Sequence, residues 1–329
     1  MSLLFHRLQY MITFFSWRPR RISTLAFLML IILSCKKNDD RVAVPQTVTD
    51  RILEDSQLSL FRAVVAQAGI SDAFKDGNLT LFAPTDSAFQ ASGLSNVAAI
   101  MSIPKEQART LVLYHTLYGS IASAKIPSGV NAVEMVSKSI AFFNKSSNGT
   151  IYINNAKVIQ ADLSVANGYV HKINRVLSPP AGNLLTTVQS NANLTFLSAA
   201  LKRIGTSNPN LLATLTTTIS ANPVTIFAPN DDAFKGDSKY NSLAAIESAD
   251  AQTLINMVLY HVTSGALFSN QFQTGAVTSL FNSNKFTLTV ASNQTTLKGN
   301  KNTTVATIKQ ADLSVNNGVI HIIDKVLQP

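Results

Sequence analysis

The sequence contains a single cysteine, Cys35, so no disulfide can form within the chain. Charged residues are also scarce, at 14%, whereas apolar residues make up 46%. This balance excludes a largely disordered chain and supplies enough apolar side chains for packed cores. The length of 329 residues suggests about two domains, each of which must be stabilised by its core alone.

The sequence also lacks a concentrated basic segment of the kind that binds nucleic acids. The net charge is +9, but four arginines and no acidic residue lie within the first 34 positions. The remainder holds 23 basic and 18 acidic side chains, and the basic residues are scattered without interleaved aromatics. We therefore predict no nucleic-acid partner.

No apolar run is long enough to cross a membrane as a helix. The longest run, residues 22–33, contains 12 residues, whereas a spanning helix needs about 20. Three arginines within residues 18–21 precede it, which is typical of a signal peptide over residues 1–34. Both Met1 and Met11 are compatible with this interpretation as the start of the chain.

The apolar run ends in Ile-Leu-Ser-Cys35, which resembles the lipobox of bacterial lipoproteins. The resemblance implies cleavage before Cys35 and acylation of that cysteine, for instance with palmitate, and several acyl chains anchor a protein firmly. The alternative is an uncleaved signal anchor with an incidental cysteine. We expect residues 35–49 to form an acylated cysteine and a charged tether.

The charged segment at residues 36–40, Lys-Lys-Asn-Asp-Asp, resembles the tethers of lipoproteins from the Bacteroidetes group. There, lysine followed by acidic residues resembles a signal for export to the cell surface. A solvated linker without a specific role explains the same residues equally well. We expect an outer-membrane lipoprotein of the cell envelope, and the face of the membrane stays open.

The rest of the chain is an internal repeat. Three segments occur twice in the same order, at offsets of 145, 146 and 150 residues. The matched pairs are 80–89 with 225–234, 112–115 with 258–261, and 161–168 with 311–318. A period of this length indicates tandem domains, which we place at residues 50–180 and 183–329 on either side of a Pro- and Gly-containing junction.

Both copies open with an apolar helical face, which in the first copy runs to Gly69, a predicted C-cap. In the second copy the same face leads to Gly205, and we predict a surface loop over residues 206–210. The elements expected next in the first copy are a strand at 80–82 ended by Pro84, a helix capped by Thr85 or Asp86 (Asn230 or Asp231 in the second copy), a helix at 108–117, and strands at 151–153, 158–163 and 169–177. Asn167-Gly168 and Asn317-Gly318 predict hairpin turns.

Three motifs together resemble the fasciclin domain family. They are Phe-Ala-Pro-Thr/Asn-Asp followed by Ala-Phe, a Tyr-His pair, and a closing Asp-Leu segment with Asn-Gly and a histidine. The resemblance covers nearly all of the chain beyond the tether. It implies an α+β fold, with two tandem fasciclin-like domains that each pack a β-wedge against several helices. It also implies adhesion or extracellular binding without catalysis.

The candidate site residues occupy matched positions in the two copies. They are Asp86, Tyr114, His115 and His171 in the first copy, and Asp231, Tyr260, His261 and His321 in the second. We interpret the histidines as buried core groups, with His115 hydrogen-bonded to Asp86 or Thr85. In animal relatives the Tyr-His region is a proposed adhesion determinant. The resemblance gives only weak support for the same role of the Tyr-His pairs in this chain.

A catalytic triad is a competing hypothesis. With a two-residue Asn-Gly turn, Ser164 would lie opposite His171, and Asp162 would lie on the same face. The second copy repeats these residue types with Ser314, His321 and Asp312. Because the histidine then falls in an apolar sheet without an oxyanion-hole motif, we predict no catalytic residues and no enzyme activity. No metal-binding spacing and no nucleotide motif is present, so we expect no cofactor.

The sequence thus favours a non-enzymatic adhesion or binding lipoprotein, attached to the membrane by its N-terminal lipid, with an extracellular protein or glycan as partner. The alternative is a protein that captures a glycan or another ligand for an outer-membrane uptake system. A third option is a spacer that only projects its domains.

Overall fold

The computed structural model describes residues 46–70, 74, 77–216 and 222–329. Cys35, the predicted signal peptide and most of the charged tether lie outside the described residues. Within the described part of the chain, no helix combines the length and apolarity that a membrane span requires.

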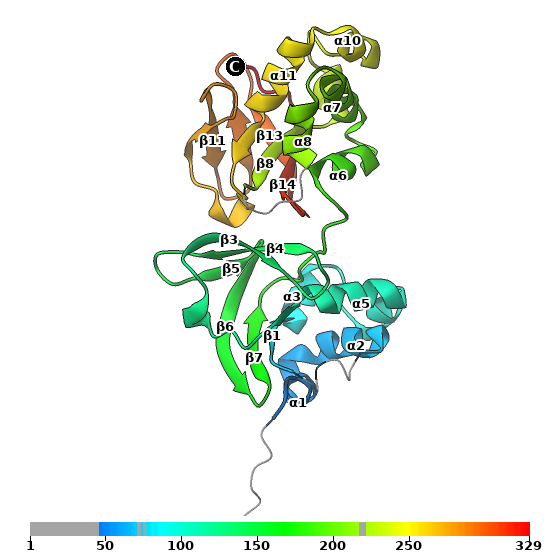
Figure 1. The fold of residues 1–329 in the computed structure, drawn as a ribbon, viewed down its shortest axis with the longest axis vertical. Coiled ribbons are helices and arrows are strands. Elements are labelled where there is room, and N and C mark those ends of the chain that lie inside the picture. The colour runs from blue at the N-terminus through cyan, green and yellow to red at the C-terminus, as the bar shows by residue number, and fades with distance from the viewer. Residues whose placement is uncertain (1–45, 71–73, 75–76, 217–221) are drawn as a thin grey trace, which may run out of the picture. The chain divides into compact units, whose positions relative to one another are not determined.

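In each repeat the helices gather on one side of a seven-stranded sheet (Figure 1). The helices of the first repeat are α1 (Val48–Glu54), α2 (Ser59–Ala68), α3 (Asp86–Ala91), α4 (Val97–Met101) and α5 (Lys105–Tyr114). Its strands are β1 (Leu79–Pro84), β2 (Thr116–Tyr118), β3 (Gly129–Glu134), β4 (Ile140–Lys145), β5 (Ile151–Ile153), β6 (Ala156–Val165) and β7 (Gly168–Ile173).

The second repeat follows the same order with one additional helix after its opening pair. Its helices are α6 (Leu184–Ser190), α7 (Thr195–Ser207), α8 (Pro209–Thr216), α9 (Asp231–Lys235), α10 (Leu243–Ser248) and α11 (Ala251–Tyr260). Its strands are β8 (Val224–Pro229), β9 (Val262–Ser264), β10 (Gly275–Thr278), β11 (Lys285–Val290), β12 (Thr295–Lys298), β13 (Ala306–Val315) and β14 (Gly318–Ile323).

The first and last strands of each repeat lie side by side, as the second and third strands from one edge of the sheet. The strand order is β2-β1-β7-β6-β5-β4-β3 in the first repeat and β10-β11-β12-β13-β14-β8-β9 in the second. β1 runs parallel to β7 and β8 runs parallel to β14, whereas the other pairs are antiparallel. This order brings the Phe-Ala-Pro strand next to the strand that carries the second histidine.

Two apolar clusters fill each repeat. In the first repeat, one cluster joins the helices to the sheet through residues such as Phe61 and Phe89. The other lies within the curved sheet and includes Phe82, Tyr114 and Phe143, with the Phe82 and Phe143 rings edge to face. The second repeat has corresponding clusters. Burial of this many large side chains explains how each repeat can be stable without disulfides.

The predicted opening helix is confirmed in the first repeat. Phe61, Val64, Val65 and Ala68 are buried on one face of α2, and Gly69 ends it in the left-handed conformation, at φ 66°. Left-handed backbone at a helix end is the position that glycine fills without a steric penalty. α1 begins at Val48, shortly before the domain start that we predicted.

The predicted loop over residues 206–210 is wrong. α7 continues through Gly205 to Ser207, and α8 begins at Pro209. Proline is well suited to the first position of a helix because its missing N–H has no helical partner there. A Cβ at Gly205 would lie 2.4 Å from Cδ2 of Leu212, so this glycine allows the two helices to pack closely rather than ending the first of them.

The predicted turns at Asn167-Gly168 and Asn317-Gly318 are displaced by one residue. Val165 pairs with Gly168 and Val315 pairs with Gly318, so each glycine is the first residue of a strand. At Gly168, with φ 147°, an added Cβ would lie 1.7 Å from the carbonyl oxygen of Leu79. The glycine is therefore required for the close approach of β1 to β7.

Candidate functional site

The Tyr-His pairs lie at the C-terminal ends of two corresponding helices. Tyr114 is the last residue of α5 and His115 is its C-cap, and Tyr260 and His261 occupy the same positions on α11. None of these four side chains is more than 1% exposed. A partner could touch these residues only if the surrounding core opened, which argues against direct recognition by the pair.

Backbone groups engage both ring nitrogens of His115. Nδ1 donates to the carbonyl oxygen of Leu111 at 2.8 Å, and Nε2 accepts from the amide of Leu177 at 2.9 Å. The amide can only donate, so this network assigns the proton to Nδ1. The predicted bond to Asp86 or Thr85 is therefore wrong.

His261 repeats this arrangement in the second repeat. Its Nδ1 donates to the carbonyl oxygen of Met257 and its Nε2 accepts from the amide of Leu327, each at 2.8 Å. Burial lowers the pKa of both His115 and His261 to about 4, so both are neutral at physiological pH. Each histidine joins the end of its helix to the segment that follows the last strand.

The motif aspartates cap the second helix of each repeat. Asp86 accepts from the amide of Leu60 at 2.8 Å and from the Ser59 hydroxyl at 2.6 Å, at the start of α2. Asp231 accepts from the amide of Phe196 at 3.0 Å and from the Thr195 hydroxyl at 2.7 Å, at the start of α7. A carboxylate here satisfies orphan amides and interacts favourably with the helix dipole.

The cap of the following helix differs between the repeats. Asn230 accepts from the amide of Ala233 at 2.8 Å and caps α9, as predicted. Thr85 occupies the same position before α3, but its hydroxyl pairs with that of Ser87 instead of a helix amide.

The tyrosine hydroxyls are also used internally. Tyr114 donates to the carbonyl oxygen of Ile140 at 2.8 Å and accepts from the side-chain amide of Asn154 at 3.0 Å. Burial raises the pKa of Tyr114 to about 12. Tyr260 likewise donates to the carbonyl oxygen of Lys285, at 2.8 Å. These bonds connect α5 and α11 to the sheet of their own repeat.

A bulge in β6 prevents the triad considered above. The strand register places Ser164 opposite Tyr169, not opposite His171. Asp162 lies in the bulge with φ 58°, and its backbone amide, not its carboxylate, meets Nδ1 of His171 at 3.1 Å. Nε2 of His171 donates to the carbonyl oxygen of Ile121 at 2.9 Å. No hydroxyl is bonded to the imidazole.

The Asp162 carboxylate binds a serine that the sequence did not single out. It accepts from the amide of Ser123, at 2.7 Å, and from the hydroxyl of the same residue. In the second repeat, Asp312 at φ 64° binds Ser269 in the same way. His321 accepts from the Asp312 amide at 3.2 Å and donates to the carbonyl oxygen of Leu267 at 2.8 Å. In each repeat these Asp, Ser and His residues join the bulge to the segment after the short strand β2 or β9.

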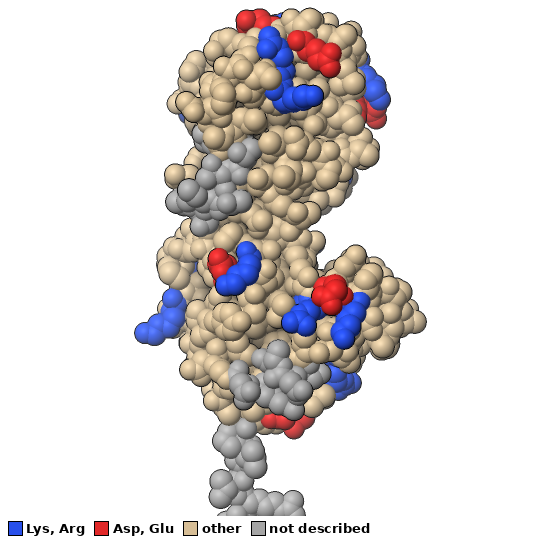
Figure 2. Space-filling model, turned by 45° about the vertical axis from the view of Figure 1, so that its right-hand side comes forward, with Lys and Arg blue, Asp and Glu red and all other residues tan. Residues whose placement is uncertain are grey.

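The charged side chains suggest no highly charged ligand. On the face that Figure 2 shows, acidic and basic residues are few and of mixed sign. Among the described residues, no three His, Cys, Asp or Glu side chains come together as they would to hold a metal ion.

The chain belongs to the fasciclin domain family. The family model described as "Fasciclin domain" matches residues 56–179 and again residues 193–329. This confirms the resemblance seen in the sequence, and the two α+β repeats are tandem fasciclin domains.

Curated relatives come from several kingdoms. The chain is 26% identical to human periostin over 88% of its own length, and 30% identical to protein sll1483 of Synechocystis over 41%. It covers 32% of periostin and 74% of sll1483. It is also 26% identical to Fasciclin-1 of Drosophila melanogaster over 91% of its length and 47% of that protein. The chain thus spans about a third of periostin.

A solved structure of a fasciclin domain pair, from the insect cell adhesion molecule fasciclin I, is also similar. The match covers 82% of this chain and 96% of the solved chain, with 18% sequence identity and a TM-score of 0.40.

Proposed function

We propose that this chain is a non-enzymatic lipoprotein of the cell envelope that mediates adhesion or extracellular binding through its tandem fasciclin domains. One observation carries the proposal: each of the four matched histidines uses both ring nitrogens in bonds to backbone groups of its own domain. The shared motifs hold the domain together, which leaves recognition to surface loops. Family membership supports the same interpretation.

A second candidate is a protein that captures a glycan or another ligand for an outer-membrane uptake system. It is favoured by a hollow on the second domain, lined by polar side chains around Asp237. The two candidates share the anchored, non-catalytic binding domains and differ in what the binding serves.

Attachment to the membrane is tested at Cys35. In a bacterium that processes lipoproteins, the protein should incorporate labelled palmitate and partition with membranes, because the segment ending at Cys35 resembles a lipobox. Cys35→Ser should abolish labelling and either release the protein or halt its maturation. Ser34→Ala, which keeps a small residue before the cysteine, serves as the control. Normal maturation and membrane partitioning of Cys35→Ser would refute the lipoprotein proposal.

Adhesion is tested with lipid-coated beads that display the full-length protein. We expect these beads to be retained on cells of the producing species several-fold more than beads displaying a lipoprotein with an unrelated domain of similar size. Retention is counted under flow, at low and at physiological salt, to separate charge attraction from specific contact. Equal retention of the two bead types would refute adhesion and leave ligand capture or the role of a spacer.

A further inference from the structure

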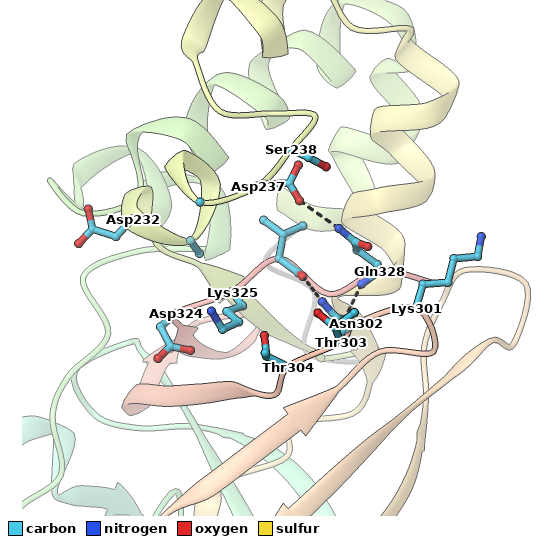
Figure 3. A pocket seen from close by; sticks show the side chains of 13 residues that line it. Asp232, Asp237, Ser238, Lys301, Asn302, Thr303, Thr304, Asp324, Lys325 and Gln328 are labelled. Carbon is cyan, nitrogen blue, oxygen red and sulfur yellow. Dashed lines mark hydrogen bonds between the residues drawn. The ribbon is translucent and has the colours of Figure 1, made fainter.

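A polar groove lies on the surface of the second domain, beside Ala233 of the Phe-Ala-Pro motif and beside Met257 and Leu327, the backbone partners of His261. A cavity of about 270 Å³ opens between the α9–α10 loop, the β12–β13 loop and the C-terminal segment (Figure 3). A neighbouring cavity of about 390 Å³ shares Asp237, Ser238, Lys301, Val326 and Gln328 with it, so the two adjoin and are together called the groove here. The larger cavity falls within the size range of small-molecule sites.

One side of the groove is formed by a loop that the first domain lacks. β12 ends at Lys298 and β13 begins only at Ala306, whereas β5 ends at Ile153 and β6 begins at Ala156. Asn302 fixes this longer loop to the C-terminal segment: it accepts from the amide of Gln328 at 2.9 Å and donates to the carbonyl oxygen of Val326 at 2.9 Å. The groove is thus a specific feature of the second domain and is held open by hydrogen bonds.

Asp237 fixes the opposite side. Its carboxylate is buried and accepts from the amides of Lys239 and Tyr240, at 2.8 and 3.0 Å. The side-chain amide of Gln328 reaches the same carboxylate at 3.3 Å and links the two sides. A ligand would therefore meet preorganised polar groups, which lowers the entropy lost on binding.

The chemistry of the groove is balanced between donors and acceptors. Figure 3 shows Asp237 and Ser238 on one side and Asp324, Lys325 and Thr304 across from them. Carboxylates accept hydrogen bonds, the ammonium group donates them, and hydroxyls do both. Opposite charges in one small cavity disfavour a strongly anionic or cationic ligand, because either would meet like charge.

The neighbouring cavity adds an apolar wall. Tyr240, Met257, Phe281 and Leu327 line it beside the polar part. A matching ligand must therefore offer several hydroxyls along one edge and carbon-bound hydrogens along another. Sugars have this distribution, whereas a fatty acid has no hydroxyls for the polar side and an inorganic ion has no apolar face.

We infer that this groove of the second domain binds a neutral oligosaccharide. The inference rests on the proposed extracellular binding function and names a ligand class for it. Ser238, Thr304 and Lys325 bind sugar hydroxyls, and the apolar wall packs against a ring face. The carboxylates of Asp237 and Asp324 already accept hydrogen bonds from within the domain and add only their remaining lone pairs.

The test uses the full-length protein in a detergent without a sugar headgroup, on an array of neutral, sialylated and sulfated oligosaccharides. Two separate blocking variants, Ser238→Trp and Thr304→Trp, place a large side chain at exposed positions on opposite sides of the groove. Thr289→Trp on β11 makes a similar change at an exposed position outside both cavities.

We expect the parental protein and Thr289→Trp to bind neutral oligosaccharides equally, and both blocking variants to bind them at least about tenfold more weakly, a loss of about 1.4 kcal/mol. Undiminished binding by the blocking variants overturns the inference, as does a parental protein that binds only charged glycans or none. The bead assay measures adhesion independently of the array. If the beads are retained but no glycan binds, the groove inference is rejected and the adhesion proposal stands.

Discussion

Replacing His115 or His261 with alanine is expected to lower the free energy of unfolding of the mutated domain by about 3–5 kcal/mol. Each substitution leaves a buried amide and a buried carbonyl without partners, which costs roughly 1–3 kcal/mol. The cavity left by the imidazole adds the cost of lost packing. For His115 the stranded groups are the Leu177 amide and the Leu111 carbonyl.

Calorimetry of the full-length protein measures this effect on the mutated domain. Tyr118→Ala is a suitable control, because that aromatic side chain is 67% exposed and its loss should change stability by less than about 0.5 kcal/mol. An unchanged melting temperature together with lost bound zinc, measured by elemental analysis, would show that the histidines serve as ligands.

The same variants should also change how stability depends on pH. An unfolded histidine has a pKa near 6.5, whereas the pKa of His115 and of His261 in the fold is about 4. The folded state favours the neutral form of each histidine. The neutral histidine therefore contributes its full stabilisation of the fold above pH 6.5, and this contribution is lost as the pH falls toward 4. The loss is on the order of 3 kcal/mol for each histidine. The alanine variants should lack this part of the pH dependence, and an unchanged acid profile would contradict it.

Gly168→Ala and Gly318→Ala should be at least as damaging, with a loss above about 4 kcal/mol or failure of the domain to fold. The added Cβ would lie 1.7 Å from the Leu79 carbonyl oxygen in the first domain and 1.8 Å from that of Val224 in the second. The obstacle is the backbone of the neighbouring strand, so a side-chain rotation cannot relieve the overlap. Urea denaturation measures the loss.

Gly149→Ala separates this steric effect from the general cost of replacing a glycine. Gly149 has φ 83° in the turn between β4 and β5, and an added Cβ there meets nothing within 4 Å. Its substitution should cost only the strain of a left-handed alanine, about 1–2 kcal/mol. Equal losses at Gly149 and Gly168 would show that the approach of β1 is not the reason for the glycine.

The sequence predicted features that depend on local pattern. The buried face of α2 and its end at Gly69 follow from helical spacing and from the conformational freedom of glycine. The family, the tandem repeat and the α+β class followed from ordered motifs. Strands β2, β3 and β4 were not predicted, and β2 begins within the residues expected to end the helix at 108–117, which instead runs from Lys105 to Tyr114. β3 has a mostly exposed or half-buried pattern without clear alternation, so periodicity could not identify it.

The hydrogen-bond partners of the candidate site residues could not be predicted from residue types alone. The partners of His115 are backbone groups of Leu111 and Leu177, and any residue type supplies those groups. The bulge at Asp162 shifted the register of β6, which turned the expected Ser-His-Asp arrangement into a different set of contacts. Ser123 could not be identified from the sequence, because it lies 39 residues from Asp162 and the two meet only in the folded domain.

The parallel pairing of β1 with β7 has a consequence for how each domain folds. The parallel ladder joins Leu79 to Gly168, so it closes only after nearly the whole domain sequence is present. The chain must lose the entropy of loop closure before contacts between distant residues can stabilise it, so domains rich in such contacts fold slowly. A nascent or truncated chain without its last strand exposes one edge of β1 and lacks the ring of His171 that stacks on Phe82. Folding is therefore postponed until the end of the domain arrives, and a partial domain gains little protection from proteases.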